Sequence, residues 1–397
     1  MMVDDAPPPP TFDPSLFTTL QERLETSGPL AAVDQLCEEL KATEDLQSYF
    51  YAKLMRKRIE LQVSPFPSGP ASDLPPETHE AYEEAIREAG REVGQSYLER
   101  GDIGKAWMFF RLIGEPEPVR QAIANYQPGD GDDPYPVIEV AWQQGVLPEK
   151  GFDLVLDRNG VCSAITMVHT SDLSSNPSLR QYCIARLVTA LSEQLRERLR
   201  SDLQSRGDQP NADASIAELL AIRPDLVTED TYHIDVSHLS SVVQMAMHLT
   251  PCPELDLARE LCLYGSRLSS ALKGDQDPPF ENTYDDYKVY LDILAGVDVE
   301  SGLAHFRAKL PAAAEEGNSY PAEILVNLLV KLDRLAEALA VAREHLATMD
   351  ERKLSCPGVH ELARRLGDFA ILSEISKTRS DPVNFLAGLI AARTGSQ

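Results

Sequence analysis

The stretch that decides the fold reads REAGREVGQSYLERGDIGKAWMFFRLIGEPEPVR and runs from Arg87 to Arg120. Its apolar residues recur at helical spacing on both sides of a glycine-containing turn. Gly94 and Ala106 are small enough to let two antiparallel helices approach each other, and Tyr97 and Phe110 can fill the space beside them. The stretch therefore predicts two packed helices joined by a short turn.

The turn and the end of this unit carry their own signals. Gly101 can adopt the positive φ angle of a helix C-cap, so the turn is expected at Gly101 and Asp102. Pro118 is expected to end the second helix, because proline cannot donate to the helical hydrogen-bond ladder.

At this spacing the residues resemble the tetratricopeptide repeat, a helix pair of about 34 residues that stacks into a right-handed solenoid. The unit departs from the usual pattern at Gly90, where a large aromatic residue is common, and at Ile113, where a small one is common. The resemblance implies stacked helix pairs whose concave face binds a protein or peptide. On that face of this unit, the implied binding residues are Glu92, Gln95 and Glu99.

Helical periodicity continues along most of the chain, and β-branched alternating runs are almost absent. We predict an all-α fold, an irregular α-solenoid of antiparallel helix pairs, with a long helix over Ser178–Arg206 and Pro-rich breaks dividing it into two sub-arrays. Only short helices are expected over Pro136–Gln144 and Phe152–Leu156. The expected regions are a disordered Pro-rich arm over 1–12, N-terminal helices over 13–62, a repeat region over 76–206 that contains the unit at 87–120, and a C-terminal repeat region over 214–397.

The net charge indicates which class of partner the chain binds, and the cysteine pattern indicates the cellular compartment. The 63 acidic and 37 basic residues give a formal net charge of −26, which argues against general affinity for nucleic acid or for an anionic membrane. A basic or neutral protein or peptide partner is favoured instead. The six cysteines form no CxxC pair, the N-terminus lacks the pattern of a signal peptide, and no apolar run is long enough to span a bilayer. These features predict a cytoplasmic protein.

One group of residues suggests chemistry beyond packing. His233, Asp235 and His238 fall within six residues, and His169 could approach them from an earlier helix. Imidazole and carboxylate are ligands that a divalent metal such as zinc accepts, so these four residues are a candidate metal or binding site. The alternative is structural, because Asp235 is also a natural N-cap for a helix that starts near Val236.

Two further patterns are open to both functional and structural interpretations. Cys162 and His169 lie seven residues apart and could share a helix face, as a nucleophile and its base would. A free cysteine in an apolar helix is more often part of the core. The basic run KLMRKR at 53–58 could bind a carboxylate or phosphate, or could form local ion pairs in so acidic a chain.

Two hypotheses of function follow. The first is a non-enzymatic interaction scaffold or adaptor of the helical-repeat type, which needs no cofactor. The second is a metal-dependent or general-base enzyme that uses the His/Asp cluster on the same helical scaffold. The sequence contains no GxxxxGK[ST], GxGxxG or GxSxG motif, so nucleotide-binding and hydrolase families of those kinds are set aside.

Overall fold

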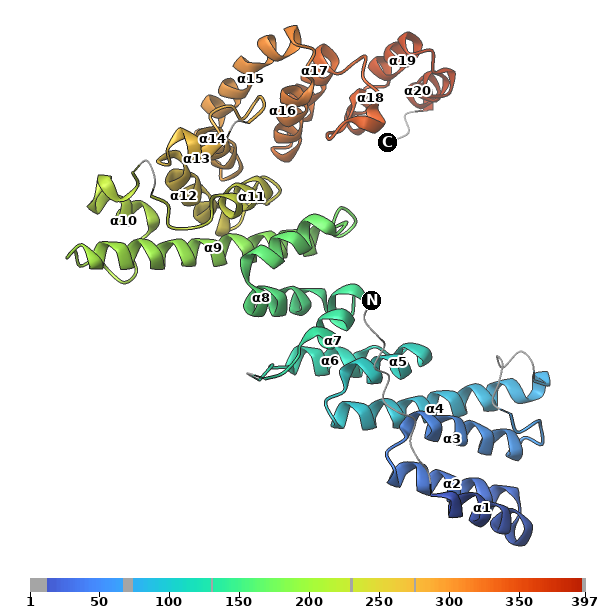
Figure 1. Cartoon of the computed structure of the whole chain (residues 1–397). Coiled ribbons are helices and arrows are strands. Elements are labelled where there is room, and N and C mark those ends of the chain that lie inside the picture. The colour runs from blue at the N-terminus through green and yellow to red at the C-terminus, as the bar shows by residue number, and fades with distance from the viewer. Residues whose placement is uncertain (1–12, 67–73, 130, 229–230, 275, 395–397) are drawn as a thin grey trace. The chain divides into compact units, whose positions relative to one another are not determined.

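The computed structural model describes residues 13–66, 74–129, 131–228, 231–274 and 276–394 (Figure 1). Throughout these residues the regular elements are helices and none is a strand, so the predicted all-α class is confirmed. The Pro-rich arm predicted over 1–12 lies outside the described residues. None of the described helices combines the length and the apolar character needed to cross a lipid bilayer.

The chain divides into two compact units, Met1–Arg158 and Asn159–Gln397. The boundary lies inside α8 (Pro148–Thr170), next to Gly160, whose φ of 79° and ψ of 179° interrupt the helical geometry. This boundary differs from the predicted division by the long helix over Ser178–Arg206 and the Pro-rich breaks. The helix around Phe152 is also longer than predicted, since it begins at Pro148 and continues to the break at Gly160.

In the first unit each helix packs mainly on the next one along the chain, from α1 to α6. Asp13 caps α1 and Asp45 caps α3, each by accepting a hydrogen bond from a backbone N–H of the first turn. The α-helices of this unit before α8 are α1 (Pro14–Ser27), α2 (Pro29–Ala42), α3 (Leu46–Glu60), α4 (His79–Glu99), α5 (Ile103–Ile113), α6 (Glu117–Asn125) and α7 (Tyr135–Ile138), which a π-helical turn (Glu139–Gln143) extends.

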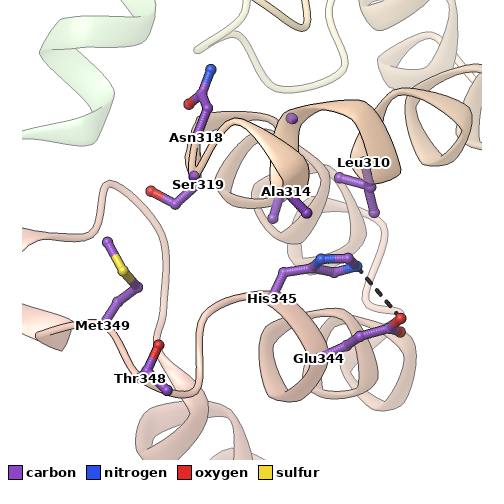
Figure 2. Close-up of a pocket in the computed structure, with 11 residues that line it drawn as sticks. Leu310, Ala314, Asn318, Ser319, Glu344, His345, Thr348 and Met349 are labelled. Atoms are coloured by element: carbon purple, nitrogen blue, oxygen red, sulfur yellow. Dashed lines mark ion pairs between the residues drawn. The ribbon is translucent and has the colours of Figure 1, made fainter.

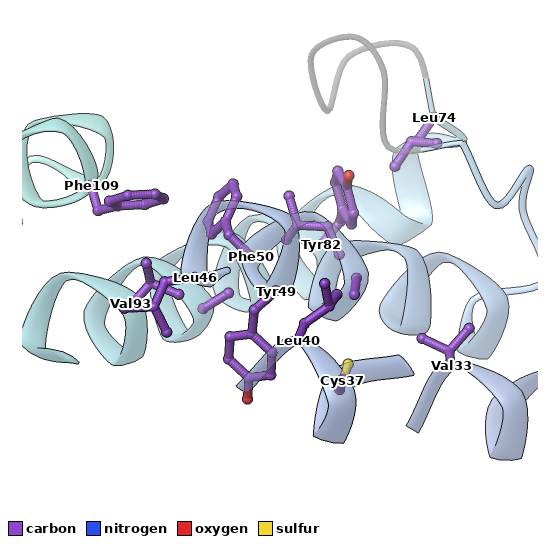
Figure 3. Packing of buried hydrophobic residues seen from close by; sticks show 13 residues of the cluster. Val33, Cys37, Leu40, Leu46, Tyr49, Phe50, Leu74, Tyr82, Val93 and Phe109 are labelled. Carbon is purple, nitrogen blue, oxygen red and sulfur yellow. The ribbon is translucent and has the colours of Figure 1, made fainter. Parts of the chain in front are cut away.

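The core of α2 to α5 is formed by aromatic and aliphatic side chains that meet between successive helices (Figure 3). Phe109 from α5 reaches Phe50 of α3, and the two ring centres lie 5.3 Å apart with an edge-to-face tilt of 65°. Tyr97 of α4 stacks on the same Phe109 ring at 5.8 Å. Aromatic contacts thus connect α3, α4 and α5 into one core.

The quoted stretch forms the helix pair α4–α5. Gly101 has a φ of 76° and makes the predicted turn. A Cβ atom on Gly94 would lie 2.7 Å from Cε2 of Phe110, so the absence of a side chain lets the two helices approach. The prediction for Pro118 was wrong: α5 ends at Gly114, which adopts the left-handed C-cap conformation, and Pro118 lies in the first turn of α6.

The second unit is built around α9 (Pro177–Ser205), which packs against α10, α11 and α12. Four leucines of α9 that recur every four residues, Leu187, Leu191, Leu195 and Leu199, are fully buried. Beyond α12, successive helices again pack on their neighbours along the chain. The remaining α-helices are α10 (Ile216–Ile222), α11 (Val236–Ala246), α12 (Glu254–Ser266), α13 (Ser270–Lys273), α14 (Tyr284–Leu294), α15 (Val299–Glu315), α16 (Tyr320–Lys331), α17 (Leu335–His345), α18 (Val359–Leu366), α19 (Phe369–Thr378) and α20 (Pro382–Thr394).

Small residues also set close helix contacts in the second unit. A Cβ atom on Gly265 of α12 would lie 2.4 Å from Cγ of Tyr284 in α14, and one on Gly302 of α15 would lie 2.6 Å from Cγ1 of Ile293 in α14. Glycine on one helix therefore accommodates a large side chain of its partner, as Gly94 accommodates Phe110 in the first unit.

Candidate functional site

A pocket with a volume of about 510 Å³ opens in the second unit beside α14 and α16. Arg180, in the first turn of α9, and Lys331, at the end of α16, both line it. Within the described part of the chain, no aspartate or glutamate lines this pocket, although the whole chain carries a formal charge of −26. The lining of this Lys331 pocket consists of Arg180, Gln244, Met247, His248, Tyr287, Tyr290, Tyr320, Ile324, Asn327, Lys331 and Ser355.

The amine of Lys331 is held by a neutral partner. Its Nζ atom donates a hydrogen bond to the carbonyl oxygen of Met247 and lies 5.8 Å from the centre of the Tyr290 ring. Lys331 is exposed to solvent along part of its side chain, but the pocket walls remove part of the hydration of its amine. That burial, followed by the charge of Arg180, lowers the pKa of Lys331 to about 8. Among the residues that the structure describes, no carboxylate lines the pocket to stabilise the charge of this amine.

His248 also lines the pocket and adds no negative charge to it. His248 is exposed to solvent, but packing against the pocket wall removes part of the hydration of its imidazole ring. This loss, followed by the charges of Lys331 and Arg180, lowers the pKa of His248. The imidazole is thus a neutral group at pH 7, with one N–H donor and one acceptor nitrogen.

Three tyrosines supply most of the aromatic wall. Tyr287 and Tyr290 of α14 are buried, and Tyr287 stacks on Phe280 with ring centres 4.3 Å apart. Burial raises the pKa of the Tyr287 and Tyr290 hydroxyls, and the electrostatic influence of Tyr320 raises it further. Tyr320 is 41% exposed and starts α16. All three phenols therefore keep their hydroxyl protons at neutral pH and can donate hydrogen bonds.

A buried carboxylate near this wall has its own donors. Oε1 of Glu323 accepts a hydrogen bond of 2.9 Å from the hydroxyl of Ser319. Oε2 accepts two bonds of 2.8 Å, from the backbone N–H and the hydroxyl of Ser355. These donors stabilise the negative charge of Glu323 without using Lys331 or Arg180.

The predicted His/Asp cluster has local and tertiary partners of its own. The backbone N–H of His233 donates to the hydroxyl of Tyr264 at 2.7 Å, and its ring Nε2 lies 3.2 Å from Oδ2 of Asp202. Asp235 caps α11, as the structural alternative expected, by accepting from the backbone of Ser237 and His238.

His169 is an exposed residue near the end of α8, and Cys162 lies exposed on the same helix. Among the residues that the structure describes, no three or more His, Cys, Asp or Glu side chains are arranged to hold a metal ion. His169, His233, Asp235 and His238 are therefore not brought together as one set of ligands.

The residues implied to bind a peptide in the first unit lie along α4. Glu92 faces α2 and α3, where it accepts from Lys41 at 2.5 Å and from the Tyr49 hydroxyl at 2.8 Å. Gln95 and Glu99 are exposed, and a 3.3 Å hydrogen bond joins them. Glu92 thus belongs to a network between helices, while the other two remain accessible.

The basic run at 53–58 forms local ion pairs, as one of its two interpretations predicted. Arg56 pairs with Asp34 at 2.6 Å, and the Lys53 amine lies 3.2 Å from Glu92. Arg58 is buried and donates to the carbonyl oxygen of Ser64.

A second cavity, of about 240 Å³, lies between α15, α16 and α17 and is shown in Figure 2. His345 and Glu344 line it, and their nearest charged atoms are 3.9 Å apart. Leu310 and Ala314 make one side apolar. This cavity contains one carboxylate and one imidazole, so it lacks the excess of positive charge that marks the Lys331 pocket.

One further cluster has the order of a catalytic triad. His360 contacts Oε1 of Glu351 at 2.8 Å through Nδ1 and the hydroxyl of Ser376 at 3.2 Å through Nε2. Ser376 is 0% exposed and donates to the carbonyl oxygen of Leu372 at 2.7 Å, while Arg379 also binds Glu351. A substrate cannot reach this hydroxyl, so the cluster stabilises the packing of the last helices.

Comparisons with models of protein families, with curated proteins and with solved structures find no match to this chain. The candidate site therefore rests on the geometry of the Lys331 pocket. This pocket was not predictable from the sequence, because Arg180, His248 and Lys331 are far apart along the chain and form no motif.

Proposed function

We propose that this chain is a non-enzymatic interaction scaffold of the helical-repeat type, an irregular tetratricopeptide-like solenoid of antiparallel helix pairs. The contact between Gly90 and Ile113 supports this proposal. A Cβ atom on Gly90 would lie 2.7 Å from Cγ2 of Ile113, so the two departures from the usual repeat pattern face each other. The large and small residues have exchanged places, and the two helices can still pack closely.

The binding site that we propose is the Lys331 pocket, and the observation that carries the proposal is its charge. Two cations and, among the described residues, no carboxylate line this cavity, although the whole chain is strongly acidic. Such a pocket favours an anionic group, because this group would restore the interactions that Lys331 lacks.

The partner that we propose is therefore a protein or peptide that inserts an acidic or otherwise anionic group into the pocket. This differs from the basic or neutral partner expected from net charge, because the pocket is a local exception to that charge. The exposed Gln95 and Glu99 of the first unit remain candidates for contacts with basic groups. We place the interaction in the cytoplasm, on the spacing of the cysteines in the sequence.

The experiment uses the whole chain as bait in an extract of its own cells. We expect at least one captured protein to be lost from the double variant Arg180→Gln/Lys331→Met. The same protein should be retained by Lys353→Met, which removes an exposed lysine outside the pocket. Retention of every captured protein by the double variant would contradict the proposed site, and turnover of a small molecule without a retained partner would contradict the scaffold.

A further inference from the structure

We propose that the anion recognised by the Lys331 pocket is a phosphate monoester, an inference that rests on the proposed function and specifies the ligand of that site. The argument uses the number of hydrogen-bond donors, the number of positive charges and the space available. The donors and the charges separate a phosphate monoester from a simple carboxylate, and the space shows that the group bearing the phosphate also fits.

The pocket offers more donors than a carboxylate can use. The guanidinium of Arg180 carries five N–H groups, and the hydroxyls of Tyr287, Tyr290 and Tyr320 are protonated. Nδ2 of Asn327 donates to the carbonyl oxygen of Ser355 at 3.0 Å and keeps a second N–H. A carboxylate has two oxygens, whereas a phosphate monoester has three terminal oxygens that accept strong hydrogen bonds.

The charges fit a dianion. Arg180 and Lys331 together provide two positive charges when the lysine is protonated, and a phosphate monoester carries about −1.5 to −2 at pH 7. A carboxylate would leave one of the two cations uncompensated. Guanidinium and ammonium groups that bind phosphate oxygens form charge-assisted bonds, which are roughly twice as strong as neutral ones.

The space fits a phosphate together with the group that bears it. The pocket volume of about 510 Å³ far exceeds the room that one small ion needs. Met247 and Ile324 add apolar surface to the lining, and Tyr320 is exposed. These side chains can contact the carbon skeleton of the ester while the polar groups hold its phosphate.

Binding should be coupled to proton uptake by Lys331. The charged or titratable groups that line the pocket with it are Arg180 from α9, His248 after α11, Tyr287 and Tyr290 from α14, and Tyr320 from α16. Glu323 lies on the same helix as Lys331, but its carboxylate accepts hydrogen bonds from Ser319 and Ser355. Because the pKa of Lys331 lies near 8, a bound dianion would raise this pKa and draw a proton onto the amine. Affinity should therefore fall as the pH rises above about 8.

The test is calorimetric titration of the whole chain with two probes of similar size, phenyl phosphate and benzoate, near pH 7. We expect phenyl phosphate to bind at least about tenfold more tightly than benzoate, which is the gain from about one added charge-assisted bond. Lys331→Met and Arg180→Gln should each weaken phenyl phosphate binding about tenfold. Lys353→Met should leave this binding unchanged, and Tyr320→Phe, which keeps the ring, should weaken it less.

The pH dependence gives a second readout. Binding of phenyl phosphate should strengthen between about pH 5 and pH 7 as its second proton leaves, since that pKa is about 6. It should weaken above about pH 8 in the wild type, and Lys331→Met should lose this upper limb while keeping the lower one. Benzoate should lack the lower limb around pH 6.

The possible failures can be told apart. If benzoate binds as tightly as phenyl phosphate, and both depend on Lys331, the phosphate inference is overturned while the anion pocket of the proposed function stands. If both probes bind equally well to wild type and Lys331→Met, or if neither binds, the inference and the pocket fail together.

Discussion

Glu92 shows how one side chain that the sequence suggested for binding is used inside the fold. Burial alone would raise its pKa, but hydrogen bonds from Lys41 and Tyr49 and the charge of Lys53 outweigh this effect and lower it to about 2. A carboxylate with a lowered pKa stabilises the fold above its unfolded pKa of about 4.3, and this contribution is lost as the pH falls toward the folded value.

Replacing Glu92 by Gln should therefore destabilise the first unit at pH 7. Because the group is partly exposed, we expect a loss of about 1 kcal/mol. The difference between variant and wild type should shrink at about pH 3, as measured by urea denaturation, because Glu92 of the unfolded chain is then largely protonated while the folded carboxylate is still charged. Glu99→Gln on the same helix is the control, since Glu99 is exposed and its carboxylate accepts an exposed hydrogen bond from Gln95. A difference that grows on acidification would contradict this assignment.

A second residue-scale prediction concerns Gly94. Replacing glycine by alanine inside a helix normally stabilises it by about 1 kcal/mol. Here the new Cβ would lie 2.7 Å from the ring of Phe110, which is only 2% exposed. We expect Gly94→Ala to destabilise the protein by about 1–2 kcal/mol, because overpacking outweighs helix propensity.

Gly104→Ala is the matched control for this substitution. Its Cβ would meet Cβ of Pro136 at 3.7 Å, an ordinary contact, so the variant should be neutral or slightly stabilised. Equal denaturation midpoints for Gly94→Ala and Gly104→Ala would show that α4 and α5 are not in close contact.

Short-range roles of residues were predictable from the sequence, and long-range ones were not. Asp235 was expected to cap a helix and does so, because a cap depends only on the next few residues. The partners of His233, which are Asp202 and Tyr264, each lie 31 residues away along the chain. The hydrogen bonds of His233 with these two residues depend on how α9, α11 and α12 pack against one another.

At the scale of helices, α4 and α5 form the pair on which the fold prediction was based. Ala106 is 0% exposed in α5. Ala106→Leu adds three carbon atoms to this close-packed position and should destabilise the first unit by roughly 1–3 kcal/mol. Urea denaturation would measure the change, and Met108→Leu is the control because Met108 is 61% exposed on the same helix. An unchanged midpoint for Ala106→Leu would be incompatible with the observed burial.

The existence of most helices followed from their apolar periodicity, but several boundaries did not. Pro118 was expected to end a helix and instead begins one, because Gly114 had already ended α5. Val359–Leu366 and Phe369–Thr378 are two helices, since Gly367 adopts a φ of 68° between them and ends the first. A proline or glycine marks a break, yet the pattern alone does not say on which side of it the helix lies.

At the scale of the molecule, the Lys331 pocket brings together residues that the sequence keeps far apart. Arg180, His248 and Lys331 come from α9, from the segment after α11 and from α16. Each would be an ordinary surface residue if its helix stood alone. Their combined effect, including the lowered pKa of Lys331, arises only when the helices of the second unit pack around one cavity.

The most direct measurement of the central claim, that a partner occupies this pocket, is brief acetylation of lysines followed by mass spectrometry. In the isolated chain Lys331 should react readily, because it is accessible and its pKa is lowered. In complex with a captured partner, the account predicts that acetylation of Lys331 falls severalfold while that of the exposed Lys353 does not change. Equal acetylation of Lys331 in the free and bound chain would contradict it.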